Sequence, residues 1–189
     1  MALSGDATAF ETLYDRLQGG IYRYALRMTG SPATAEDVTQ EVFLSLISDR
    51  CDYEQSKGMV KSYLYGMARH RLLRKLTHER NFVALETSNS EQAHDGNSGN
   101  HDPFLSLARD EVVELVRQAV LSLPENFREV IVLCDLQEMN YAEAAEIIDC
   151  PIGTVRSRMA RARQLLVRKL GILKTPAETT TTIQALKAT

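Results

Sequence analysis

The chain has 189 residues, 44% of them hydrophobic, with a net charge of −3 at pH 7 and a pI of about 5.8. This length allows one domain or two small ones. The start MALSGDATAF lacks the basic head and apolar run of a signal peptide, and no stretch resembles a membrane span, so we expect a cytoplasmic protein without membrane insertion. The three cysteines (Cys51, Cys134 and Cys150) do not suit a disulfide framework. Neither the cysteines nor the four histidines have the spacing of a zinc site, so no metal or cofactor is expected.

The first segments read as amphipathic helices. Apolar residues at helical spacing predict a helix over residues 6–17, which Gly19 and Gly20 are expected to end. A second helix is predicted over residues 21–29, with Ile21, Tyr24, Ala25 and Met28 facing inward.

Ser31 and Pro32 form a strong helix start, an N-cap serine followed by proline, for a third helix that runs to about Ser48. Its predicted core stripe is Val38, Val42, Phe43, Leu46 and Ile47. Another face carries Glu36, Asp37, Gln40 and Glu41. The helix dipole explains acidic residues in the first turn but not Gln40 and Glu41, which lie further along.

A polar loop over residues 49–58 precedes a long predicted helix over residues 59–80, whose net charge is +5. Tyr63 lies among the basic side chains of this helix. Aromatic rings beside arginines suit stacking on unpaired bases, but a half-buried tyrosine with its hydroxyl in water is an equally good interpretation.

Residues 86–102 are almost without apolar side chains, which predicts a flexible linker and a domain boundary. A helix is expected over residues 103–123, and Pro124 starts another. The apolar side chains of that second helix, Cys134 among them, should pack beneath the segment that follows.

Residues 141–170 read as two helices joined by a turn. Ala142, Ala145, Ile147 and Ile148 give the first helix an apolar stripe, and residues 149–151 end it. Thr154 is the predicted N-cap of the second helix.

The second of these helices is basic. Residues 151–170 contain six basic residues and no acidic one, while Val155, Met159, Ala162, Leu166 and Leu170 recur at helical spacing as its buried face. A solvated arginine face is the simplest interpretation. The turn, the small residues at the helix crossing and the lack of carboxylates favour instead a helix-turn-helix that binds DNA in the major groove.

Three segments resemble the regions of a bacterial sigma factor. AEDVTQEVFLSL (residues 35–46) is similar to the polymerase-binding helix of region two, VKSYLYGMARHRLLRKL (residues 60–76) to the minus-ten element, and residues 123–166 to region four, above all in IGTVRSRMARAR. The linker in place of region three and the short length resemble the extracytoplasmic-function (ECF) group of the sigma-70 family.

This resemblance implies an all-α fold with two small helical domains joined by a flexible linker. Region two would occupy residues 1–80, the linker residues 81–103 and region four residues 104–170, and the Thr-rich tail at residues 171–189 is expected to lack stable structure. The implied function is that of an alternative sigma factor, without enzymatic activity, which directs promoter recognition, DNA melting and transcription initiation.

The implied partners are promoter DNA and the beta-prime coiled coil and beta flap of core RNA polymerase. Asp37, Gln40 and Glu41 would contact the coiled coil, and residues 49–58 would receive a flipped base. The minus-ten contacts would be Lys61, Tyr63, Arg69, His70, Arg71, Arg74 and Lys75. At the minus-thirty-five element, the bases would meet Arg156, Ser157, Ala160 and Arg161. The DNA backbone would meet Thr154, Arg158 and Arg163.

The chain departs from the family pattern at His70, where Asn is common, and at Tyr63, where Trp is common. A stand-alone helix-turn-helix regulator would leave Asp37, Gln40, Glu41 and the first basic helix without a purpose. A decoy that binds only an anti-sigma protein would not need basic faces, and an enzyme would need a paired nucleophile and base. Many relatives are held by an anti-sigma protein and others by different means, and the sequence leaves that choice open.

Overall fold

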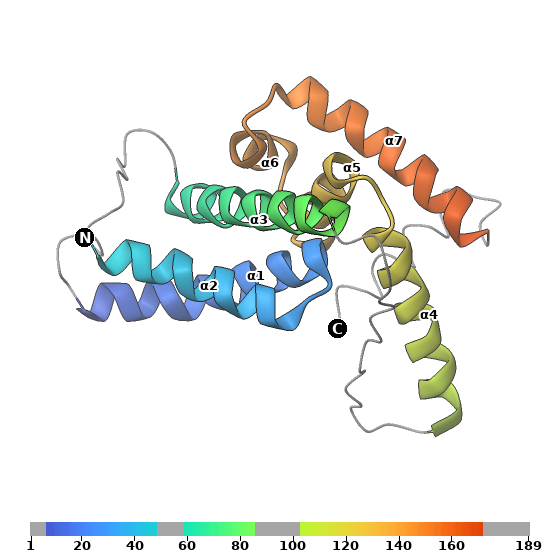
Figure 1. Ribbon diagram of the computed structural model, residues 1–189, viewed down its shortest axis with the longest axis horizontal. Coiled ribbons are helices and arrows are strands. Elements are labelled where there is room, and N and C mark those ends of the chain that lie inside the picture. Colours follow the sequence, from blue (N-terminus) through green and yellow to red (C-terminus); the bar gives the residue numbers. More distant parts are fainter. Residues whose placement is uncertain (1–6, 49–58, 86–102, 172–189) are drawn as a thin grey trace.

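The computed structural model describes residues 7–48, 59–85 and 103–171, and within these ranges all regular secondary structure is helical (Figure 1). The helices are α1 (Ala7–Thr29), α2 (Pro32–Ile47), α3 (Val60–Leu85), α4 (Pro103–Leu121), α5 (Glu125–Val130), the π-helix η3 (Ile131–Leu136), α6 (Tyr141–Ile148) and α7 (Ile152–Leu170). The predicted all-α class is confirmed. The expected 49–58 loop, most of the linker and the Thr-rich tail lie outside the described residues.

Helix α1 is continuous, so the predicted break at Gly19 and Gly20 is wrong. The reason lies outside the helix. A Cβ atom at Gly20 would meet the hydroxyl oxygen of Tyr65 at 2.5 Å, closer than real Cβ contacts come. Gly20 is therefore explained by the close approach of another helix and not by a turn.

Helix α2 begins as predicted, because the Ser31 hydroxyl oxygen accepts a hydrogen bond from the Thr34 amide at 3.2 Å. Its predicted core stripe is buried except for Ile47, which is 61% exposed, so that assignment is wrong. Helix α3 continues past the predicted end at Arg80 to Leu85, and the first residues of the expected linker are therefore helical.

The sequence predicted one regular helix after Pro124, and this prediction is wrong. The segment consists of α5 followed by η3. The Gln137 amide donates to the Val132 carbonyl at 2.9 Å, the five-residue spacing of a π-helix. At the end of this segment, the Leu136 carbonyl and the Gln137 side chain form hydrogen bonds with α1.

The helix-turn-helix is present as α6 and α7. A capping box holds the start of α6: the Asn140 side chain accepts from the Glu143 amide, and the Glu143 carboxylate accepts from the Asn140 amide. The buried small residue at the crossing is Ala144, and the predicted Ala142 is exposed. Helix α7 begins at Ile152 with Pro151 as its N-cap, so Thr154 lies in the first turn and is not the predicted cap.

Two groups of helices pack against each other. Helices α1, α2 and α3 form the N-terminal group, and α6 lies against the opposite side of α3 (Figure 1). The α5, η3 and α4 segments contact α1, and the buried apolar side chains of both groups form a contiguous cluster. Among the described helices, none is both long and apolar enough to cross a bilayer.

Candidate nucleic-acid interface

Helix α7 has a buried face and an opposite exposed face. Val155, Met159, Ala162 and Leu166 are buried, as predicted. On the exposed face lie four residues predicted to meet bases, Arg156, Ser157, Ala160 and Arg161, together with Gln164, which the sequence analysis did not select. Arginine and glutamine pair bidentately with guanine and adenine edges, respectively, so this face has the chemistry needed to read a major groove.

The three predicted backbone contacts of α7 have different surroundings. Thr154 is half-buried, and its carbonyl accepts a hydrogen bond from the Ser157 hydroxyl at 3.0 Å. Arg158 is half-buried, and its charge acts on Glu129 of α5. Arg163 forms a two-point ion pair with Asp135 of η3, at 2.7 and 3.2 Å, and this contact raises the pKa of Arg163. The ion pair connects α7 to η3, so only part of the Arg163 guanidinium is available for a contact with DNA.

Two of the seven residues predicted for the minus-ten element point to the C-terminal helices. The Lys61 ammonium lies 3.5 Å from the Glu143 carboxylate of α6, and the Arg69 Nε lies 2.8 Å from the Glu129 carboxylate of α5. The Tyr24 hydroxyl also donates to Glu129, at 3.2 Å. Burial raises the pKa of Glu129, and the Arg69 guanidinium opposes that rise.

Two further minus-ten residues point to α2. Arg71 lies 3.1 Å from Glu41, and Lys75 lies 3.3 Å from the same carboxylate and also pairs with Asp37. Two of the three residues predicted to contact polymerase are thus paired with α3. These side chains are partly exposed, and such pairs contribute about 0–1 kcal/mol, so a partner can replace them at low cost.

The remaining minus-ten residues are placed differently. His70 and Arg74 are exposed and line a shallow groove of about 680 Å³ along α3 with Arg71 and Lys75. Tyr63 is half-buried against the core, which favours the structural interpretation of that residue. Helix α3 therefore has one side toward α2, one toward α5 and α6, and one free basic side.

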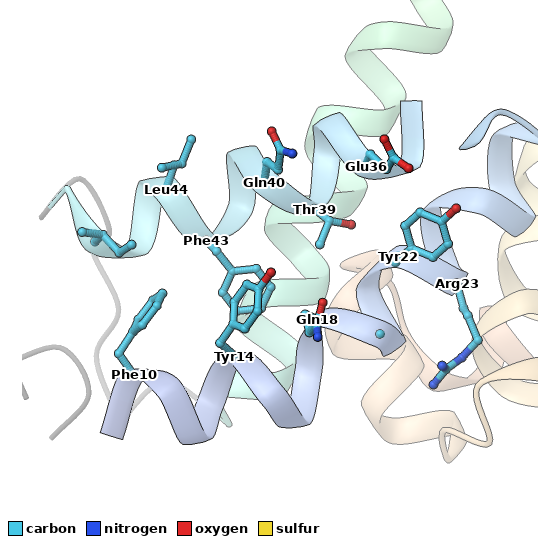
Figure 2. Close-up of a pocket in the computed structure, with 12 residues that line it drawn as sticks. Phe10, Tyr14, Gln18, Tyr22, Arg23, Glu36, Thr39, Gln40, Phe43 and Leu44 are labelled. Atoms are coloured by element: carbon cyan, nitrogen blue, oxygen red, sulfur yellow. The ribbon is translucent and has the colours of Figure 1, made fainter. Parts of the chain in front are cut away.

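An apolar groove of about 500 Å³ between α1 and α2 was not predicted (Figure 2). Phe10 and Tyr14 of α1 and Phe43 of α2 pack there, with the rings of Tyr14 and Phe43 4.8 Å apart. Figure 2 shows Gln40, the third predicted polymerase contact, and Leu44 on the α2 side of this groove. Leu44 and Ile47 are each 61% exposed. The signal that could have revealed this surface is that the apolar residues of α2 cover a wider part of the helix than one core stripe.

Among the side chains that the structure describes, no group of three His, Cys, Asp or Glu residues could hold a metal ion. Cys134 is half-buried, consistent with a structural role, and burial together with the Asp135 charge raises the pKa of its thiol to about 11.

The family models match the same two parts of the chain. Residues 13–82 match sigma-70 region 2, and residues 114–166 match sigma-70 region 4. The ECF RNA polymerase sigma-E factor of Escherichia coli strain K12 is 32% identical over 177 residues, which cover 88% of each protein.

Two solved structures have a similar fold. The sigma factor RpoE from Bartonella quintana, in complex with the anti-sigma factor NepR, matches with a TM-score of 0.67 and 21% identity, over 88% of this chain and 99% of that one. CnrH, in complex with the cytosolic domain of CnrY, matches with a TM-score of 0.62 and 26% identity, over 90% and 92% of the two chains.

Proposed function

The chain belongs to the ECF group of RNA polymerase sigma factors, and we propose that it binds core RNA polymerase and directs it to promoters. The observation that carries the proposal is the exposed face of α7, which gathers Arg156, Ser157, Ala160 and Arg161 on a helix-turn-helix. Work with the polymerase would place the chain in the cytoplasm, and the function requires no catalysis.

The site residues divide into three proposed roles. The α7 face reads bases of the minus-thirty-five element, and Thr154, Arg158 and Arg163 contact the nearby backbone. His70 and Arg74 hold phosphates of the melting strand along the free side of α3. Arg71 and Lys75 join them once released from Glu41 and Asp37, and Lys61 and Arg69 once released from Glu143 and Glu129. Residues 1–80 and 104–170 serve as the two binding domains, with α3 extending into the connection.

The polymerase contact is proposed to centre on α2. Gln40 is exposed beside the apolar groove, and Leu44 and Ile47 extend the same surface. Asp37 and Glu41 form its acidic edge. Their ion pairs with Lys75 are partly exposed, so the polymerase can replace Lys75 as their partner. Large exposed apolar side chains gathered on one helix are typical of a protein interface.

Run-off transcription with core polymerase on a pool of promoters from the source genome tests the function. Addition of the chain should produce new transcripts that start downstream of a shared two-part motif. Binding of duplex DNA without new transcripts, and without association with core polymerase, would indicate a stand-alone helix-turn-helix regulator instead.

Arg156→Ala tests base reading by α7 on the promoter so found. Loss of a bidentate pair should weaken binding by about 1–3 kcal/mol and relax specificity at one position. Arg16→Ala is the matched control, because Arg16 is exposed on α1 and is assigned no contact with DNA. An equal loss for Arg156→Ala on matched and scrambled promoters would contradict base reading.

A further inference from the structure

Among the residues that the structure describes, Arg163 is the only arginine of α7 that an ion pair holds. Its Nε and Nη2 atoms donate to the two carboxylate oxygens of Asp135 in η3, at 3.2 and 2.7 Å. Arg156 and Arg161 of the reading face are exposed and have no such partner among these residues. The fold thus fixes one arginine beside the reading face and leaves the proposed base readers mobile.

The ion pair leaves part of the Arg163 guanidinium open. A guanidinium carries five N–H donors in one plane. The contact with Asp135 uses one donor on Nε and one on Nη2, so both donors on Nη1 and the second on Nη2 remain. The edge formed by Nη1 and Nη2 can donate two parallel hydrogen bonds to a phosphate. The Arg163 side chain is 48% exposed, which lets a ligand reach this edge from solvent.

Arg163 also lies in a suitable place on α7. It is seven residues, or about two turns, beyond Arg156 and on the same side of the helix. Its neighbour Ala162 is buried, so Arg163 stands at the border between the reading face and the buried face. When a helix lies in the major groove, side chains at such a border meet the sugar-phosphate backbone, and these contacts set the register of the helix.

The stability of the fold does not explain Asp135 well. Its side chain is 13% exposed, so its charge is largely removed from water. Desolvation offsets much of the attraction in such a pair, and apolar residues in its place are often as stable. An arginine that is already oriented, by contrast, loses less side-chain freedom when it binds a phosphate. Orientation of Arg163 therefore explains a carboxylate that lies close to a surface for DNA.

On the basis of the proposed function, we propose that Asp135 is a positioning residue, which orients Arg163 so that its open edge meets a phosphate of the minus-thirty-five element. Asp135 itself does not contact the DNA. A carboxylate near DNA repels phosphates, so loss of its charge should strengthen binding if electrostatics alone acted. Positioning predicts the opposite sign.

Duplex binding by an Asp135→Asn variant tests this sign. The probe is a fluorescein-labelled duplex oligonucleotide of mixed sequence, measured by anisotropy with the full chain at about 50 mM salt. Affinity should fall by about two- to tenfold, the factor expected when one long side chain must be ordered on binding. Equal or tighter binding by the variant would overturn the proposal, as would an unmodified chain that does not bind the duplex.

Glu114→Gln is the matched control. Glu114 accepts from Nε and Nη2 of Arg117, at 2.6 Å each, in the same two-point geometry but within α4, to which no DNA contact is assigned. Its affinity for the duplex should equal that of the unmodified chain. Circular dichroism checks that each variant is folded, and Asp135→Ser replaces Asp135→Asn in the test if the asparagine variant does not fold.

A double-mutant cycle with Arg163→Ala separates positioning from a general effect on the fold. Arg163→Ala should weaken binding and lower the salt slope by about one, because one phosphate contact is lost. In that background, Asp135→Asn should cause no further loss. The same loss with and without Arg163 would show that Asp135 acts through the fold and not through Arg163.

Run-off transcription keeps this test distinct from that of the proposed function. Failure of the unmodified chain to support transcription would reject the proposed function, whatever the duplex measurements show. A chain that supports transcription but binds the duplex independently of Asp135 would reject the positioning role alone.

Discussion

Gly20 and Gly19 are adjacent in α1 but meet different neighbours. A Cβ at Gly20 would meet the Tyr65 hydroxyl at 2.5 Å, whereas a Cβ at Gly19 would meet only the mobile end of Arg23, at 3.3 Å. Gly20→Ala should lower the free energy of unfolding by about 1–3 kcal/mol, the usual cost of an overpacked site. Gly19→Ala should raise it by about 0.5–1 kcal/mol through helix propensity.

Urea denaturation followed by circular dichroism measures both glycine variants against the unmodified chain. The two substitutions add the same methyl group to the same helix, so propensity alone would change stability equally. Stabilisation by both would show that Tyr65 moves aside freely and that its approach does not constrain Gly20.

The Cys134 thiol should react slowly. Burial and the nearby Asp135 carboxylate raise its pKa from 9.0 to about 11, and only the thiolate attacks an alkylating agent. With Cys51→Ser and Cys150→Ser in place, iodoacetamide at a pH of about 8 should modify the folded chain about a hundredfold more slowly than the urea-unfolded chain. Similar rates in the two states would mean that the environment of Cys134 in the fold does not suppress its thiolate.

At the scale of single elements, the start of α6 depends on one side chain. The Asn140 oxygen accepts from the amides of Ala142 and Glu143, at 2.9 and 3.0 Å. Asn140→Ala should cost about 0.5–2 kcal/mol in thermal or urea unfolding, while Asn140→Asp keeps the acceptor and should cost little. If the alanine and aspartate variants unfold alike, the cap contributes nothing to the helix-turn-helix.

Elements with strong local signals were predictable from the sequence. The cap at Ser31 and Pro32 placed the start of α2, and the apolar period of α7 separated its buried face from Arg156, Ser157, Ala160 and Arg161. The break at Gly19 and Gly20 was wrong because a local signal cannot tell a helix end from a close approach of Tyr65. The π-helix η3 has no comparable signature in its apolar sequence.

The partners of the α3 cations required the assembled molecule. Helical period indicates which side chains share a face, but not which neighbour covers that face. Lys61 and Arg69 therefore read as free basic residues in the sequence. In the structure they contact Glu143 and Glu129, which lie 82 and 60 residues further along the chain. The exposure of Ile47 was missed for the same reason, since its apolar character suggested a core position, and Leu44 was assigned to no surface.

At the scale of the whole molecule, the contacts between the two groups of helices determine whether they unfold together. The contiguous apolar cluster favours one cooperative unit. The polar contacts between the groups, such as those of Arg69 with Glu129 and of Gln137 with Gly20, favour two units. Each hydrogen bond contributes only about 0.5–1.5 kcal/mol net, because its donor and acceptor can return to water when the groups separate. The proposed release of Lys61 from Glu143 and of Arg69 from Glu129 requires the second behaviour.

Leu166→Ala decides between these two behaviours. Leu166 is 1% exposed in the C-terminal group, and truncation there should cost about 2–5 kcal/mol. Amide hydrogen exchange at Val155 and Met159 should accelerate by that full amount. At Leu64 and Ala68 in α3 the protection should fall much less, because the N-terminal group stays folded when its neighbour opens. An equal fall at all four amides would show one cooperative unit, in which the two groups of helices cannot separate without unfolding.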